Sequence, residues 1–178
     1  LTPIINVSGF MTKIGASIES LVGGNIDTDN IRIISGNVLT GDMTDNNGFV
    51  GYYHHQITVV PEGNHHKFFL KDGWLSLGFN RFSMSMSYPT MLNPPDKEWD
   101  LDTNLNGEER AFVVSEQYEK VFPFDIYPVY LLKSILTNDI DGMEKLGIYE
   151  VAPEDFALCE FVCTSKINSQ KIIREGLD

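Results

Sequence analysis

The hydrophobic pattern of this chain changes between its first and last thirds. In residues 1–64, short β-branched and aromatic runs alternate with turns rich in Gly, Asn and Asp, a pattern typical of strands. In the last third, apolar residues recur with helical spacing behind Pro residues of the kind that open helices. The chain therefore predicts an α+β fold with a mostly helical C-terminal part.

The first part predicts a small β-rich module. A short helix is expected at residues 15–22, and residues 41–48 are expected to form a loop rich in Asp, Asn and Gly. Strands are expected at residues 3–8, 31–34, 52–60 and 67–70. Several strands with one short helix are typical of an α+β unit of the β-grasp kind.

The middle of the chain predicts a further strand and a long loop. Strict alternation over residues 81–88 places Phe82, Met84, Met86 and Tyr88 on one face of a strand. Residues 89–107 contain three Pro and a cluster of Asp and Asn, which favours a loop or a boundary. We therefore expect three parts.

The three expected parts are a β-grasp-like module at residues 1–64, a strand-rich segment and loop at residues 65–105, and a mostly helical domain at residues 106–178. Within the last part, a short strand is expected at residues 111–114. Helices are expected at residues 128–136, 141–146, 152–163 and 172–178. Gly147 is expected to end the second of them.

Charge and hydropathy exclude several classes of protein. The chain has 178 residues and a formal net charge of −12, and it has no run of Lys and Arg. Binding to nucleic acid or to anionic lipid is therefore not expected. No stretch approaches the ~20 apolar residues of a membrane span, so we expect no direct span.

The ends of the chain and its cysteines suggest an intracellular piece of a longer protein. The sequence begins Leu-Thr-Pro with no signal-peptide pattern, and it stops within an expected helix. Its two cysteines, Cys159 and Cys163, are too few for a disulfide framework, which fits a reducing compartment.

Cys159 and Cys163 are four residues apart on an expected helix, so both sulfurs lie on one face. A metal site is conceivable there, but an iron–sulfur cluster or a closed zinc site needs about four ligands, and no further ligand lies nearby in sequence. A disulfide within the helix is disfavoured by geometry. We expect two small buried thiols, neutral and slow to react.

Two Asp- and Asn-rich stretches, at residues 102–107 and 137–142, resemble the start of a calcium-binding loop. Position 12 of that loop, a bidentate Glu, falls on Val113 and on Ile148, so Asx turns are the preferred interpretation. The histidine pairs at residues 54–55 and 65–66 could supply at most two ligands to a common site. We expect solvated histidines at loop edges rather than a zinc site.

No catalytic or cofactor motif stands out. The chain has no nucleophile elbow, Walker loop, dinucleotide fingerprint or zinc-protease motif. We therefore assign no catalytic, cofactor-binding or metal-binding residue. The chain alone is expected to hold no flavin, nicotinamide or metal and to lack NADH:quinone turnover.

Several stretches together resemble the middle and C-terminal part of the A subunits of the Na+-translocating NADH:quinone oxidoreductases. They span most of the chain from Ile14 to the end. These stretches are Ile14-Gly15-Ala16-Ser17-Ile18, Ile34-Ser35-Gly36-x-Val38-Leu39-x-Gly41, Tyr53-His54-x-Gln56, Gly73-Trp74-Leu75-Ser76-x-Gly78-x-Asn80-x-Phe82-Ser83, Asn106-Gly107-x-Glu109-Arg110-Ala111, Tyr118-Glu119-x-Val121-x-Pro123-x-Asp125-Ile126 and Glu154-Asp155-x-Ala157-Leu158-Cys159-x-Phe161-Val162-Cys163.

The resemblance implies a peripheral subunit on the cytoplasmic side of the bacterial inner membrane, in a respiratory sodium pump that moves electrons from NADH to quinone. Its partners would be the other subunits of the pump, with quinone as a candidate substrate of the parent protein. The first region would be a soluble-ligand-binding β-grasp (SLBB) module. In the related protein of the Rnf complex, a cysteine run holds iron–sulfur clusters; only its last two cysteines match here, as Cys159 and Cys163, and Thr164 replaces the following Pro.

Two functions remain open. The first is a non-catalytic segment that docks against partner subunits and shapes quinone access. The second is a stand-alone β-grasp module that binds a small ligand. The candidate contact residues are Trp74, Asn80 and Phe82. Because large aromatic side chains are usually buried, a core position is favoured for Trp74 and Phe82. Cys159 and Cys163 are candidates only as vestiges of a cluster site.

Overall fold

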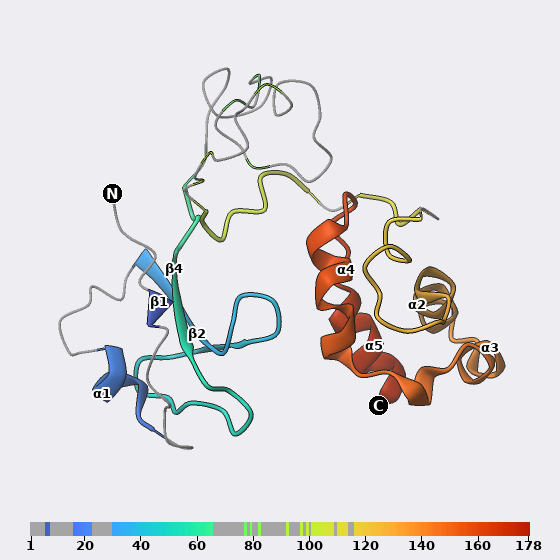
Figure 1. Cartoon of the computed structure of the whole chain (residues 1–178), viewed down its shortest axis with the longest axis horizontal. Helices are drawn as coiled ribbons and strands as arrows, with labels where there is room; N and C mark the ends of the chain where they lie inside the picture. Colours follow the sequence, from blue (N-terminus) through green and yellow to red (C-terminus); the bar gives the residue numbers. More distant parts are fainter. Residues whose placement is uncertain are drawn as a thin grey trace. The chain divides into compact units, whose positions relative to one another are not determined.

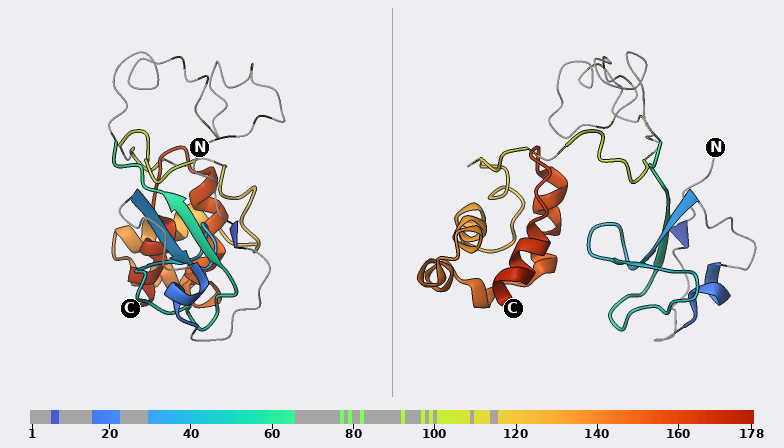
Figure 2. Two further views of the ribbon diagram at one scale, coloured as in Figure 1. Left: turned by 90° about the vertical axis from the view of Figure 1, so that its left-hand side faces the viewer. Right: turned by 180° about the vertical axis from the view of Figure 1, so that it is seen from behind.

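The computed structural model divides into two compact units, Leu1–Asn106 and Gly107–Asp178, which are described one at a time (Figures 1 and 2). It describes residues 6–7, 16–22, 30–65, 77, 79, 82, 92, 97, 99, 101–108, 110–113 and 116–178. Three predictions lie outside these residues: the strand at residues 67–70, nearly all of the strand at residues 81–88, and the positions of Trp74 and Asn80.

The first unit is built on a four-stranded sheet whose strands pair antiparallel in the order β1-β4-β2-β3. The strands are β1 (Asn6–Val7), β2 (Ile31–Ser35), β3 (Asp42–Thr44) and β4 (Ile57–Pro61). A five-residue helix, α1 (Ile18–Val22), lies within the predicted helical stretch. Figure 1 shows β2 and β4 side by side, in agreement with their five-residue register.

One face of this sheet packs into an apolar core. Ile33, Ile57 and Val59 come from the two central strands, and alternate residues along a strand share a face. Ile18 of α1 and Val50 of the loop before β4 complete the cluster. All five side chains are buried, so α1 is held by the sheet rather than by its own length.

Two strand predictions in this unit were wrong in detail. The strand predicted from residue 52 begins only at Ile57, because residues 52–53 form a turn closed by the His54 N–H donating to the Gly51 carbonyl at 3.1 Å. The predicted loop at residues 41–48 contains β3, whose Met43 pairs with Ile34. A three-residue edge strand is too short to leave a periodic pattern.

The second unit is helical, as predicted for the C-terminal part. Its elements are α2 (Pro128–Leu136), α3 (Ile140–Lys145), η3 (Ile148–Glu150), η4 (Pro153–Phe156), α4 (Ala157–Val162) and α5 (Ser169–Leu177). The predicted bounds of α2 are confirmed, with Pro128 in its first turn. The short strand predicted at residues 111–114 was wrong, because residues 111–113 are irregular.

Local chemistry explains several helix ends in this unit. The Asp139 side chain accepts from the Gly142 N–H at the start of α3, and Asn168 accepts from the Lys171 N–H at the start of α5. Gly147 has a φ of 85°, a left-handed conformation that Gly adopts without strain. It follows the end of α3, as predicted, and η3 begins at the next residue.

The second core draws all of its buried side chains from this unit. It contains apolar residues from every helical element and from the segment before α2. They are Tyr118, Phe122, Val129, Leu131, Leu132, Ile135, Met143, Ile148, Val151, Phe156, Cys159 and Ile173. Among the described residues, no helix has both the length and the apolar character needed to cross a bilayer.

Candidate functional site

A histidine clamp joins the two loops at one end of the sheet of the first unit. Ser35, the last residue of β2, places its hydroxyl 2.8 Å from His54 Nδ1, and the Gly51 N–H donates to the same hydroxyl at 2.9 Å. The Gly36 N–H donates to the Gln56 carbonyl, which ties residue 36 to the residue before β4. The Ser35 hydroxyl thus ties the end of β2 to two residues of the loop before β4.

Two glycines make room for the His54 ring. A Cβ on Gly51 would lie 2.8 Å from His54 Nδ1, and a Cβ on Gly36 would lie 3.1 Å from His54 Cδ2. Gly36 also has a φ of 103°, which side chains other than Gly rarely adopt. The ring is therefore half-buried between two backbone segments, and the prediction of a solvated loop-edge side chain was wrong for His54. His55 and His65 are exposed, as predicted.

The Ser35–His54 pair has the spacing of a nucleophile and its base, but not the accessibility. Ser35 is 3% exposed, and its hydroxyl is already bonded to a backbone N–H. Among the described residues, no carboxylate is hydrogen-bonded to His54, so the third group that orients a catalytic base is lacking in that part of the chain. The pair is a structural clamp.

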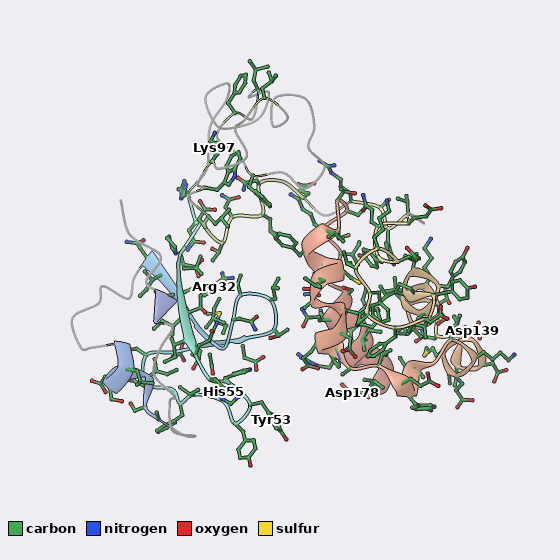
Figure 3. All side chains as sticks on the ribbon, in the orientation of Figure 1. Arg32, Tyr53, His55, Lys97, Asp139 and Asp178 are labelled. Atoms are coloured by element: carbon green, nitrogen blue, oxygen red, sulfur yellow. The ribbon has the colours of Figure 1, made fainter. Side chains whose placement is uncertain are left out.

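The loops held by this clamp expose large apolar side chains. Val38 and Leu39 lie in the loop after β2, and Tyr52 and Tyr53 lie in the loop before β4. We call these four residues the loop-tip surface. Tyr53 is 84% exposed and meets Tyr52 edge-on, with ring centroids 4.9 Å apart. Figure 3 shows Tyr53 extending from the loop that precedes β4.

A polar staple holds the segment at residues 102–104 against the end of β4. Arg32 donates two hydrogen bonds to the Glu62 carboxylate at 2.9 and 3.1 Å, and the Thr103 hydroxyl also donates to it. These donors hold the pKa of Glu62 below its ordinary value, with Thr103 contributing most. The side-chain amide of Asn104 donates to the Gly63 carbonyl, which adds a second contact between the two segments.

The two calcium-like stretches form turns and caps. The Asn104 N–H donates to the Asp102 carboxylate and the Asn106 N–H to the Asn104 amide oxygen, which confirms the predicted Asx turns. In the second stretch, the Asp139 carboxylate caps α3.

The cysteine pair lies against a buried tyrosine in the second unit. Cys159 is fully buried on α4, and burial raises its pKa to about 12. Cys163 follows the end of α4 and is only partly buried, which corrects the prediction that both thiols are buried. Both cysteines are free, and the Ile167 N–H donates to Cys163 Sγ at 3.4 Å.

Tyr118 carries the buried hydroxyl of this cluster. The residue is 1% exposed, and its Oη faces Cys163 but makes no hydrogen bond of ordinary geometry to any of the described residues. Burial raises the pKa of Tyr118. Within the part of the chain that the structure describes, no group of three or more His, Cys, Asp or Glu could hold a metal ion.

The structure places only some of the candidate contact residues. Trp74 and Asn80 lie outside the described residues. Phe82 is 44% exposed, so the prediction of a core position was wrong for this residue. Its ring meets Trp99 edge-on at a centroid distance of 5.9 Å, a contact that covers only part of an aromatic surface.

Sequence reasoning missed the clamp and the loop-tip surface. The stretches at residues 34–41 and 53–56 were recognised as a pattern, but the sequence does not show that Ser35 contacts His54 across 19 positions. Gly36 and Gly51 are the sequence signal that could have indicated the clamp, because a Gly allows the backbone to approach a bulky ring closely.

Comparison with known proteins matches this chain to part of a larger protein. The family described as "NQRA C-terminal domain" matches residues 8–46. The chain is similar to the A subunit of the Na(+)-translocating NADH-quinone reductase of Rhodopirellula baltica, at 40% identity over 93% of this chain and 36% of the relative. The A subunits of the same name from Vibrio atlanticus and Haemophilus influenzae are each 38% identical to it, over 99% and 94% of the chain.

The chain spans less than two fifths of these curated relatives, with 36% to 39% of their length covered. The similarity extends through both compact units, since at least 93% of the chain is aligned. Along almost its whole length, the chain is therefore similar to a segment of the Na(+)-translocating NADH-quinone reductase A subunits.

Proposed function

We propose that this chain is a docking segment of a peripheral subunit in a respiratory pump that transfers electrons from NADH to quinone and exports Na+. The observation that carries the proposal is the similarity to A subunits along almost the whole chain. The proposed partners are the other subunits of the pump, and the proposed location is the cytoplasmic side of the bacterial inner membrane.

The geometry of the described residues supports docking rather than catalysis. In the Ser35–His54 pair the hydroxyl is buried and the ring half-buried, and the cysteine pair includes a buried thiol whose raised pKa opposes thiolate formation. The two loops that meet at the clamp instead expose four large apolar side chains, those of the loop-tip surface. Contact residues of this kind are a usual feature of protein interfaces.

We also propose that the first unit is a β-grasp module of the soluble-ligand-binding type. Its antiparallel sheet with α1 packed on one face through Ile18 supports this assignment. In the parent protein this module would help to shape the approach of quinone.

Purification from membranes tests the docking proposal. The gene would be tagged at its natural locus, and the tagged protein purified from detergent-solubilised membranes. We expect a multi-subunit, flavin-containing assembly with NADH:quinone activity to copurify. Recovery of the tagged protein alone, together with a small bound molecule, would instead support a stand-alone ligand-binding module.

A further inference from the structure

The loop-tip surface has the composition of a protein interface. Its four members, Val38, Leu39, Tyr52 and Tyr53, are all exposed. Tyr is enriched at interfaces because it offers a large, rigid contact area with little side-chain entropy to lose. Four exposed large apolar residues on two neighbouring loops need an explanation, whereas a single exposed one does not.

The two loops are rigidly joined at their bases. They leave the same end of the sheet, where Ser35 of β2 pairs with Ile57 of β4. The Ser35 hydroxyl bonds to both His54 and the Gly51 N–H, so it fixes the loop that carries the two tyrosines. A surface held in its binding conformation before contact loses less entropy on binding.

The Asp, Glu, Lys and Arg side chains nearest to this surface in the sequence are all acidic. Residues 33–66 contain no Lys or Arg. The exposed Asp42 is the first residue of β3, directly after the loop that follows β2, and the exposed Asp45 comes directly after the end of β3. The preceding cation, Arg32, is paired with Glu62. An apolar surface whose charged neighbours in this stretch of sequence are carboxylates favours a partner that carries cations.

We propose that the loop-tip surface binds a polypeptide segment of a partner subunit in which Lys or Arg residues stand beside apolar side chains. The proposal rests on the proposed docking function and names the surface that performs it. An anionic membrane is disfavoured because the nearby charges would be repelled. A second copy of this chain is disfavoured because a two-fold contact would set two surfaces of the same sign against each other.

Site-specific cross-linking identifies the occupant. Tyr53 would be replaced in the tagged, full-length protein by the photo-reactive residue benzoylphenylalanine, and the cross-linked peptides sequenced from the purified assembly. We expect cross-links to a partner subunit, at a segment that contains Lys or Arg within a few residues of the cross-linked site. Cross-links to lipid, to a second copy or to a segment without cations would overturn the proposal.

Paired variants measure the contribution of the surface. With Tyr52→Ser and Tyr53→Ser together, we expect recovery of the assembly to fall about tenfold or more, as for interface hot spots. The matched control is Tyr149→Ser, because Tyr149 is 76% exposed in the second unit and is no part of the surface. Val38→Ser with Leu39→Ser is the second test variant, in case the tyrosine variant unfolds.

The outcomes separate this inference from the proposed function. If the unmodified protein does not copurify with the assembly, the docking proposal itself fails. If the unmodified protein copurifies and both folded loop variants copurify equally well, docking holds but the loop-tip surface is not where it occurs. If Tyr149→Ser lowers recovery as much as the loop variants do, the surface has no special role.

Discussion

At the scale of single residues, the position of the His54 side chain depends on two neighbouring glycines that have no Cβ. The His54 ring lies where Gly36 and Gly51 have no Cβ, and its Nδ1 is bonded to the Ser35 hydroxyl. The sequence contains all four residues, but the contact among them depends on a turn and a strand register that no local pattern encodes. This explains why the clamp could not be predicted, while a strand at residues 31–34, within β2, could.

Substitutions at Gly51 and His54 should be non-additive. We expect Gly51→Ala to destabilise the first unit by about 1–3 kcal/mol, because its Cβ would lie 2.8 Å from the His54 ring. In a His54→Ala background the same substitution should cost much less, since the obstructing ring is gone. Chemical denaturation of the four proteins of this cycle measures the coupling.

Gly36→Ala provides the control for that cycle. Its φ of 103° strains any side chain, and its Cβ would also lie 3.0 Å from the Gly41 Cα, so removal of the His54 ring should not rescue it. Equal costs for Gly51→Ala with and without His54 would contradict the proposed packing of the ring.

The thiols of Cys159 and Cys163 should react at different rates. Cys159 is fully buried with a pKa raised to about 12, whereas Cys163 is partly exposed. We expect a thiol reagent at neutral pH to modify Cys163 first and to leave Cys159 unmodified until the protein unfolds. Peptide mapping by mass spectrometry follows both sites, and labelling of Cys159 as fast as in denaturant would show that the site is open.

The second unit should lose stability in alkali. Burial raises the pKa of Cys159 from 9.0 to about 12 and also raises that of Tyr118. Above pH ~9 for the cysteine and pH ~10 for the tyrosine, the unfolded chain releases the proton while the folded chain retains it. The free energy of unfolding therefore falls as pH rises, by up to about 1.4 kcal/mol per pH unit for each group.

The variant Tyr118→Phe, whose side chain has nearly the same shape, tests how much Tyr118 contributes to the loss of stability in alkali. Tyr118→Phe removes a buried hydroxyl that has no hydrogen-bond partner among the described residues. We expect its stability at neutral pH to be equal or higher, by up to about 1 kcal/mol, and its decline above pH ~10 to be shallower. A large loss of stability at neutral pH would show that the hydroxyl has a partner after all.

At the scale of elements, helices were more predictable than strands. The bounds of α2 follow from Pro128 and the apolar spacing behind it, and Gly147 separates α3 from η3 through its φ of 85°. By contrast, β3 pairs only three residues and depends on its contact with β2, and the strand predicted near residue 111 does not form. Helix signals are local, whereas strand pairing is decided by distant parts of the chain.

Two leucines on α2 should respond very differently to truncation. Leu132 is fully buried in the second core, and Leu136 on the same helix is 54% exposed. We expect Leu132→Ala to cost about 2–5 kcal/mol of stability and Leu136→Ala less than about 1 kcal/mol. The pair shares helix propensity, so denaturant titration isolates the cost of the cavity.

At the scale of the whole molecule, the chain has two separate apolar cores. One is formed by residues of the sheet, α1 and the loop before β4, and the other by residues of the helical elements and of the segment before α2. Each core lies within one of the two compact units. A chain with two cores need not unfold in a single two-state step.

A substitution in one core should therefore destabilise only the unit that contains that core. We expect Leu132→Ala to lower the midpoint of a transition detected by helical circular dichroism, because Leu132 belongs to the helical core. Ile33→Ala, in the core of the sheet, should leave that midpoint nearly unchanged and instead increase hydrogen exchange at β2 and β4. Hydrogen exchange measured peptide by peptide in the same samples resolves the two units. Because each substitution removes contacts within a single core, equal loss of protection in both units from either substitution would mean that the two cores unfold as one cooperative body.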